Sequence, residues 1–186
     1  FGNKWFLFFW NPLEGGMHMA QISVNNLTFC YEGSFDNIFE NVSFSIDTDW
    51  KLGFIGRNGK GKTTFLNLLL GNYSYQGTIT GITSFDYFPY PVTEKQMQLP
   101  ATDFLEEWKM SCEEWRVICE LTQLEENAEI LYRPFATLSP GERTKVMLAV
   151  LFSGENDFLL IDEPTNHLDR TARENVKNYL SSKTGF

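Results

Sequence analysis

Cysteine and histidine are scarce in this sequence, and long apolar runs are missing from it. Its 186 residues include three cysteines, at positions 30, 112 and 119, and two histidines. No two cysteines form a CxxC pair, and His18 and His167 are far apart, so a zinc site is not expected. No apolar run is long enough to cross a membrane, and no membrane insertion is expected. The odd number of cysteines indicates reduced, semi-buried thiols in a cytoplasmic protein.

Basic residues are also in deficit. Lysine and arginine total 15 against 24 aspartates and glutamates, which gives a net charge of −9. Such a surface repels nucleic acid rather than attracting it. Hydrophobic residues make up an ordinary 42% of the chain. A chain of this length buries about 70% of its unfolded surface, which is enough for one domain with a substantial core.

Three of the 14 glycines fall in one short run that is typical of a phosphate-binding loop. The run follows the apolar residues 52–55, which predict a strand, and precedes residues 64–70, which predict a helix. Its glycines let successive backbone N–H groups point toward a polyphosphate. Lys62 is expected to reach the β- and γ-phosphates, and the Thr63 hydroxyl to ligate Mg²⁺. The alternative is a glycine-rich turn with incidental lysines. The run consists of Gly56, Arg57, Asn58, Gly59, Lys60, Gly61, Lys62 and Thr63.

A second candidate element lies about 100 residues further on. Residues 158–161 are all apolar, which predicts a short buried strand of a parallel sheet. The strand ends at Asp162 and Glu163. A carboxylate at the carboxyl end of such a strand can hold Mg²⁺, and its neighbour can polarise an attacking water. A solvated acidic turn is the alternative.

Between these two motifs, residues 138–143 predict the start of a helix. Ser139 fits the N-cap, Pro140 the first helical position and Glu142 the third, which together make a capping box. The apolar residues 146–152 then predict a buried helix. The same geometry offers backbone N–H groups and a serine hydroxyl to an anion. The start of this helix can therefore be capped by Ser139 and also bind an anion.

The three motifs, in this order, resemble the ATP-binding-cassette (ABC) family from about residue 21 to the C-terminus. The resemblance implies an α/β P-loop NTPase fold with a mixed sheet around the phosphate-loop helix. It also implies one cassette over residues 19–186, with a helical subdomain at about 91–152. The aromatic-rich residues 1–18 are expected to be a non-native or upstream extension, with Met17 or Met19 as the true start.

The resemblance also implies roles in ATP hydrolysis, with ATP and Mg²⁺ as cofactors. Asp162 matches the Mg²⁺-linked aspartate and Glu163 the catalytic glutamate. Tyr31 matches the aromatic on which the family stacks adenine, although packing at a strand end is the alternative. Asp169 matches the D-loop aspartate and also fits an N-cap. The implied metal ligands are Thr63 and Asp162. The implied nucleotide-binding residues are Tyr31, Gly56, Arg57, Asn58, Gly59, Lys60, Gly61, Lys62, Thr63, Thr64, Ser139, Gly141, Glu142, Asp162 and Asp169.

The family's site is composite, so the implied partner is a second cassette. Ser139 and Gly141 would then serve the γ-phosphate held by that partner, which belongs either to the same longer chain or to a homodimer. The chain ends before the family's switch histidine. By resemblance this predicts a truncated first cassette that, alone, binds ATP weakly and is inactive.

Asn166 and His167 resemble the ABC-F branch of the family, which acts on ribosomes. Residues 91–137 are too few for the additional arm of some ABC-F translation factors, and by resemblance this favours the branch that protects ribosomes from antibiotics. Because the chain is acidic, ribosomal contacts are expected from segments outside it. Two alternatives stay open: the ATP-binding subunit of a transporter, and a nucleotide-gated module without hydrolysis.

Two positions depart from the family pattern. Pro89 and Tyr90 stand where the Q-loop usually supplies a glutamine to the metal, and Gln96 and Gln98 are out of position. Pro140 replaces the first signature glycine and removes one N–H donor. These departures indicate a divergent branch.

Hydrophobic periodicity predicts the remaining elements. Residues 102–131 have a helical pattern, with Trp115, Ile118, Cys119 and Leu121 among the apolar positions. Strands are expected at residues 21–29, 41–46, 50–55, 78–80 and 84–88. A last helix over residues 169–180 is expected to carry on one face Ala172, Val176, Tyr179 and Leu180.

Overall fold

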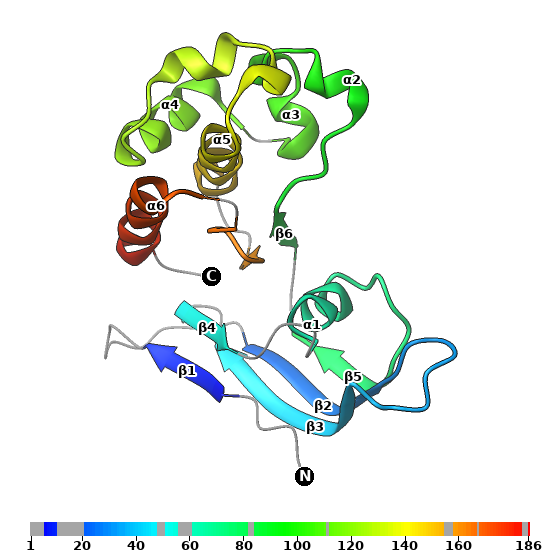
Figure 1. Ribbon diagram of the computed structural model, residues 1–186. Coiled ribbons are helices and arrows are strands. Elements are labelled where there is room, and N and C mark those ends of the chain that lie inside the picture. The colour runs from blue at the N-terminus through cyan, green and yellow to red at the C-terminus, as the bar shows by residue number, and fades with distance from the viewer. Residues whose placement is uncertain are drawn as a thin grey trace. The chain divides into compact units, whose positions relative to one another are not determined.

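The computed structural model describes residues 6–10, 21–47, 51–55, 61–81, 84–110, 112–154, 158–166, 168–183 and 186. The chain divides into two compact units, one formed by Phe1–Phe85 with Thr184–Phe186 and the other by Asp86–Lys183. Strands dominate the first unit and helices the second (Figure 1). His167 lies outside the described residues, as do the predicted loop residues Gly56, Arg57, Asn58, Gly59 and Lys60.

The main sheet of the first unit is antiparallel and has the strand order β3-β2-β5. Ile22 and Val24 are buried and pair with Ile46 and Phe44 of the neighbouring strand. This alternation of buried residues is the period-two pattern of a sheet with one covered face. The sequence predicted each of these strands to within two residues. Their bounds are β2 Gln21–Phe29, β3 Phe39–Asp47 and β5 Gln76–Thr80.

A two-stranded antiparallel sheet in the same unit joins β1 (Phe6–Trp10) to β4 (Lys51–Ile55). β4 matches the strand that was predicted before the phosphate loop. The pairing leaves the origin of residues 1–18 untested, and their description as a non-native or upstream extension stays a prediction.

The helix after the phosphate loop, α1 (Lys62–Leu69), begins two residues earlier than predicted. Its N-cap, Gly61, has a φ of 94°, a left-handed conformation that glycine adopts without steric cost. Phe65 and Leu68 are buried, and the Phe65 ring lies 5.9 Å from the ring of Phe39 in β3. The apolar face of α1 is therefore held against the main sheet.

The second unit is built around α5, whose residues 146–151 are almost wholly buried. α5 packs against α4, which contributes Val117 and Leu121, both fully buried (Figure 1). β6, which begins at the boundary between the units, pairs with β7. The elements are β6 Phe85–Phe88, α2 Glu94–Met97, η1 Ala101–Asp103, α3 Leu105–Trp108, α4 Glu114–Gln123, η2 Ala128–Tyr132, η3 Phe135–Thr137, α5 Pro140–Ser153, β7 Phe158–Ile161 and α6 Arg170–Ser182.

The helical pattern predicted for residues 102–131 is broken into several short helices. The predicted apolar face was partly wrong, because Trp115 is 60% exposed and Ile118 is half-buried. The buried row is Val117 and Leu121, four residues apart on one face of α4. Trp115 instead lies on the outer side, where its indole N–H donates to Glu113 at 3.1 Å.

The prediction of semi-buried thiols is correct for one cysteine of three. Cys30 and Cys119 are exposed, because they lie after the end of β2 and on the outer face of α4. Cys112 is buried, and this burial raises the pKa of its thiol, which lies 3.3 Å from the Ser153 hydroxyl. None of the helices that the structure describes is long and apolar enough to cross a membrane.

Candidate nucleotide site

The start of α1 carries the described part of the predicted phosphate loop. Lys62 is the first helical residue, Thr63 is exposed and Thr64 is buried. The first turn contains no acidic residue, and among the described residues no side chain makes a capping hydrogen bond at Gly61. The positive end of the helix dipole is therefore not offset by an acidic side chain of that turn, which suits an anion such as a phosphate.

Tyr31 follows β2 and is 41% exposed. Its hydroxyl lies 2.6 Å from Oγ1 of Thr64 in the first turn of α1. Its ring stands perpendicular to the ring of Phe29, with centroids 5.1 Å apart. Tyr31 is thus both a packing residue and an accessible aromatic surface, so the two predictions for it are compatible.

Asp162 stands at the carboxyl end of β7, as the sequence predicted. Its backbone N–H donates to the Phe88 carbonyl at 3.1 Å, which continues the pairing of β7 with β6. The Tyr87 hydroxyl donates to Oδ2 of Asp162 at 3.3 Å. Burial, together with the Asp162 charge and this hydrogen bond, raises the pKa of Tyr87 to about 12. Tyr87 therefore remains a donor at neutral pH.

Glu163 has an unusual backbone conformation next to Asp162. Its φ is 47°, in the left-handed region, which costs about 1–2 kcal/mol for a residue with a Cβ. The Asn166 backbone N–H donates to the Glu163 carbonyl at 3.1 Å, and its side-chain amide donates to Oε2 of Glu163. The exposed carboxylate is thus oriented by a local turn, and the strain lies at the residue predicted to be catalytic.

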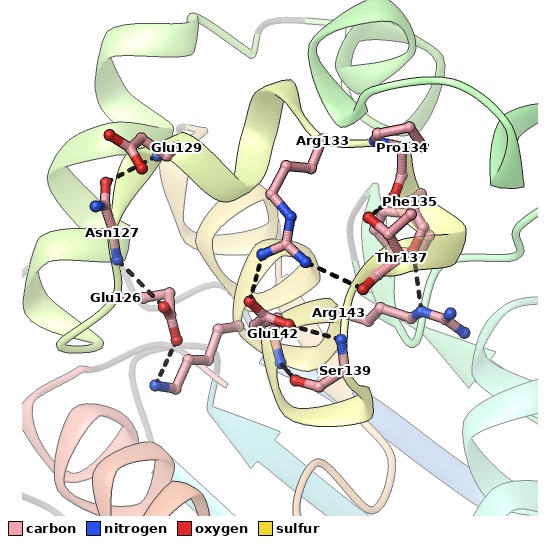
Figure 2. A network of polar contacts seen from close by, with 11 residues as sticks. Glu126, Asn127, Glu129, Arg133, Pro134, Phe135, Thr137, Ser139, Glu142 and Arg143 are labelled. Carbon is pink, nitrogen blue, oxygen red and sulfur yellow. Dashed lines mark hydrogen bonds and ion pairs between the residues drawn. The ribbon is translucent and has the colours of Figure 1, made fainter.

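The start of α5 confirms the predicted capping box. The Ser139 hydroxyl accepts from the Glu142 N–H at 3.2 Å, and Glu142 accepts from the Ser139 N–H at 2.6 Å, with Pro140 at the first position. Arg133 adds an ion pair to Glu142 at 2.9 Å, as Figure 2 shows. Partial burial acts to raise the pKa of Glu142, but these hydrogen bonds and Arg133 hold it below the ordinary 4.5.

A cavity of about 330 Å³ opens where α5 and α6 begin. It brings together four predicted site residues, namely Ser139, Gly141, Glu142 and Asp169. Asp169 is the N-cap of α6, as predicted, and accepts from the Ala172 N–H at 2.8 Å. Besides these four, the cavity is lined by Glu126, Pro140, Lys145, Thr171, Ala172 and Asn175.

Lys145 in this cavity wall was not predicted as a site residue. It is 7% exposed, and its Nζ lies 2.9 Å from Oε2 of Glu126, which precedes η2. The only signal in the sequence was a lysine at the edge of an apolar helical run. Its partner, 19 positions away, could not be identified from the sequence.

The Q-loop position holds a core residue. Tyr90 is 7% exposed, its ring stacks on that of Trp108, and its hydroxyl donates to Asp86 at 2.8 Å. Gln96 is buried as well, in a capping box with Thr93 at the start of α2. Neither side chain replaces the glutamine that the family pattern expects, and both have structural partners.

The predicted site residues thus fall into two groups. Tyr31, Gly61, Lys62, Thr63 and Thr64 belong to the first unit. The second unit holds Ser139, Gly141, Glu142, Asp162, Glu163 and Asp169. A phosphate-loop helix, a capped signature helix and an acidic strand end are together the marks of a nucleotide-binding domain of the P-loop class.

A family profile described as ABC transporter matches residues 39–166, and the chain belongs to this family. The predicted fold class, an ABC-type P-loop NTPase of mixed α/β structure, is confirmed by this match and by a solved structure. That structure is an inward-facing metal-chelate type ABC transporter, with a TM-score of 0.67 and 26% identity over 88% of this chain and 67% of the transporter chain.

Two curated relatives bear on the branch of the family. The ribosome protection protein VmlR of Bacillus subtilis (strain 168) is 31% identical over 150 residues, covering 80% of this chain and 27% of VmlR. ATP-binding cassette sub-family F member 2 of Bos taurus is 31% identical over 175 residues, covering 88% of this chain and 27% of that protein. The chain therefore spans about a quarter of the length of these relatives, and homologues in the ABC-F family are established.

Proposed function

We propose that this chain binds Mg-ATP and, together with a second cassette, hydrolyses it as part of an ABC-F protein that acts on the ribosome. The hydrolytic part of this proposal rests on the geometry at the end of β7. There a strained, exposed Glu163 is oriented by Asn166 directly beside Asp162. Strained residues of this kind cluster at functional sites, where the surrounding structure holds them in place.

The described residues fit the cofactors that the family implies. The Thr63 hydroxyl and the Asp162 carboxylate are oxygen donors of the kind that Mg²⁺ prefers. Lys62 and the N–H groups at the start of α1 would hold the polyphosphate, with the loop residues 56–60 completing the cradle. Tyr31 would stack the adenine on its exposed ring.

Glu163 would act as the general base in this proposal. A carboxylate that accepts a proton from the attacking water must be oriented toward it before the reaction. The Asn166 amide, which donates to one carboxylate oxygen, supplies that orientation. The γ-phosphoryl group then needs donors for its developing charge, which magnesium, Lys62 and the partner cassette would provide.

The cavity at the starts of α5 and α6 supports pairing with a second cassette. Ser139 and Gly141 line it, with the Asp169 N-cap beside them. In a composite site this surface would receive the γ-phosphate held by the partner, either a homodimeric copy or a second cassette. Pro140 supplies no N–H, so the remaining N–H groups and the Ser139 hydroxyl would carry this contact.

The action on ribosomes rests on the relatives and on Asn166, since VmlR is a ribosome protection protein. We infer antibiotic protection as the specific activity, in the cytoplasm, with ATP and Mg²⁺ as cofactors. Because the net charge is −9, segments outside this chain would make the ribosomal contacts.

The hydrolytic part is tested by Glu163→Gln in the chain paired with its second cassette. Phosphate release should fall by about 10²-fold or more, while ATP binding persists. The control is Glu174→Gln, the same change at an exposed glutamate whose ion pair with Lys177 lies on α6. Turnover within about twofold of the parent for Glu163→Gln would exclude Glu163 as the base.

Ribosome binding is tested by co-sedimentation of the Glu163→Gln protein with ribosomes in the presence of ATP. Retention that depends on ATP supports the ABC-F function. A transporter subunit is the second candidate, favoured by the solved transporter that this chain resembles. It predicts no ribosome retention and binding to a membrane subunit instead. A module without hydrolysis, the third candidate, predicts retention without phosphate release by the parent protein.

A further inference from the structure

Tyr73, between α1 and β5, has no role in the sequence-based account, yet it is one of the exposed large aromatic residues. It is 38% exposed, close to the 41% of Tyr31. Its ring centroid lies 5.7 Å from that of Tyr31, with the two planes at 84°. The same ring stacks on Phe29 at 5.5 Å with an interplanar angle of 30°.

Three contacts therefore fix the Tyr31 side chain. Its hydroxyl lies 2.6 Å from Oγ1 of Thr64, which is 6% exposed. Its ring meets Phe29, also 6% exposed, and Tyr73. A tyrosine side chain has only two soft torsions, so an anchored hydroxyl and two perpendicular ring contacts leave it little freedom.

The three residues that contact Tyr31 differ in their own surroundings. Thr64 and Phe29 are buried, so the core holds both independently of any ligand. Tyr73 keeps a large aromatic ring partly in water, in the surface segment that connects α1 to β5. Contact with the rings of Phe29 and Tyr31 is what its side chain provides.

We propose that Tyr73 is a positioning residue for the purine base of the bound nucleotide. It holds the Tyr31 ring at the angle at which the base stacks, and the Tyr31–Thr64 contact joins that ring to the first turn of α1. This inference rests on the proposed nucleotide site. The base is recognised as an aromatic face, whereas the triphosphate is held by the start of α1 and does not depend on Tyr73.

The test compares two ligands, Mg-ATP and Mg-tripolyphosphate, which share the triphosphate and differ in the nucleoside. Their affinities are measured by calorimetry at matched salt for the parent, Tyr73→Leu and Tyr73→Phe. Tyr73→Leu should weaken ATP binding about threefold to tenfold, the range of one aromatic pair. Tripolyphosphate binding should stay within about twofold of the parent, and Tyr73→Phe should retain the ATP affinity of the parent because it keeps the ring.

The matched control is Tyr75→Leu, the same change two positions further along. In the part of the chain that the structure describes, Tyr75 has no aromatic contact with Tyr31, so its replacement should leave ATP binding unchanged. Circular dichroism confirms that each variant is folded.

Equal ATP affinity in Tyr73→Leu and the parent would overturn the inference. So would an equal loss for both ligands, which is the mark of a merely structural role. A parent that binds neither ligand would overturn the proposed nucleotide site and this inference with it. If the parent protein binds both ligands and Tyr73→Leu changes their affinities equally, the inference about Tyr73 is overturned and the proposed nucleotide site stands.

Discussion

The ring of Tyr90 lies nearly parallel to that of Trp108, with centroids 5.1 Å apart and an interplanar angle of 5°. Trp108 in turn packs edge-on against Phe104 and Phe135, so Tyr90 belongs to a cluster of four aromatic rings. The position at which the family usually presents a glutamine to the metal has thus become part of the core. The departure from the family pattern has a structural reason, because the tyrosine at this position is buried and stacked.

We expect Tyr90→Gln, which restores the family's residue, to destabilise the protein. It removes the stacked ring and leaves a polar amide in a buried place, at a cost of about 2–4 kcal/mol of unfolding free energy. Urea unfolding measures this. Tyr90→Phe is the control, because it keeps the ring and loses the hydrogen bond to Asp86, worth about 1 kcal/mol. A Gln variant as stable as the parent would show that the stack contributes nothing.

The Asp86–Lys109 ion pair gives a second prediction about stability. Lys109 is 6% exposed, and its Nζ donates to Asp86 at 2.8 Å and to the Leu151 carbonyl at 3.0 Å. Lys109→Met leaves the Asp86 charge without its cation and should cost about 3–5 kcal/mol. The double variant Lys109→Met with Asp86→Leu should regain part of the lost unfolding free energy, as measured by urea unfolding. Two additive losses would mean that the pair is not coupled.

The lowered pKa of Glu142 leads to a prediction about how the stability of the folded protein depends on pH. Its pKa is lowered in the folded protein, so the stability it contributes is present above the unfolded value of 4.5 and is lost as the pH falls through the folded value. The difference in unfolding free energy between the parent and Glu142→Gln should therefore be largest above about pH 5, where the carboxyl group is charged in both states. It should shrink as the pH falls below that value. A difference that is constant with pH would contradict the role of Ser139 and Arg133 in stabilising the charged form.

Tyr87 gives a prediction about the metal. Tyr87→Phe removes the hydroxyl that donates to Asp162, so the Mg²⁺ concentration needed for half-maximal binding of a fluorescent ATP analogue should rise about threefold to tenfold. Binding without metal should not change. The control is Tyr90→Phe, which loses a hydroxyl bonded to Asp86 instead. An unchanged Mg²⁺ requirement in Tyr87→Phe would remove Tyr87 from the site.

Features set by local rules could be predicted from the sequence. The capping box at Ser139, the N-cap at Asp169, and the apolar strand at residues 158–161 all depend on a few neighbouring residues, and each was confirmed. Capping needs one side chain and an N–H two or three positions away, so spacing alone determines it.

Features that depend on distant partners were missed. Nothing near Lys109 in the sequence indicates Asp86, which lies 23 positions away, and nothing near Tyr87 indicates Asp162, 75 positions away. The buried face of α4 was misjudged because Val117 and Leu121 share the helical spacing just as Trp115 and Ile118 do, and packing against α5 decides which row is buried. The left-handed conformation of Glu163 left no mark in the sequence either, since glycine or asparagine would be expected there.

In the proposed function, this chain holds ATP by its phosphates through the start of α1. Calorimetry of the parent and of Lys62→Ala with Mg-ATP, at matched salt, tests it most directly. Loss of a charge-assisted contact to the phosphates should weaken binding at least about tenfold. The control, Lys177→Ala, removes an exposed lysine of α6 and should bind as the parent does. Equal affinity of Lys62→Ala and the parent would show that ATP is bound elsewhere and would contradict this account.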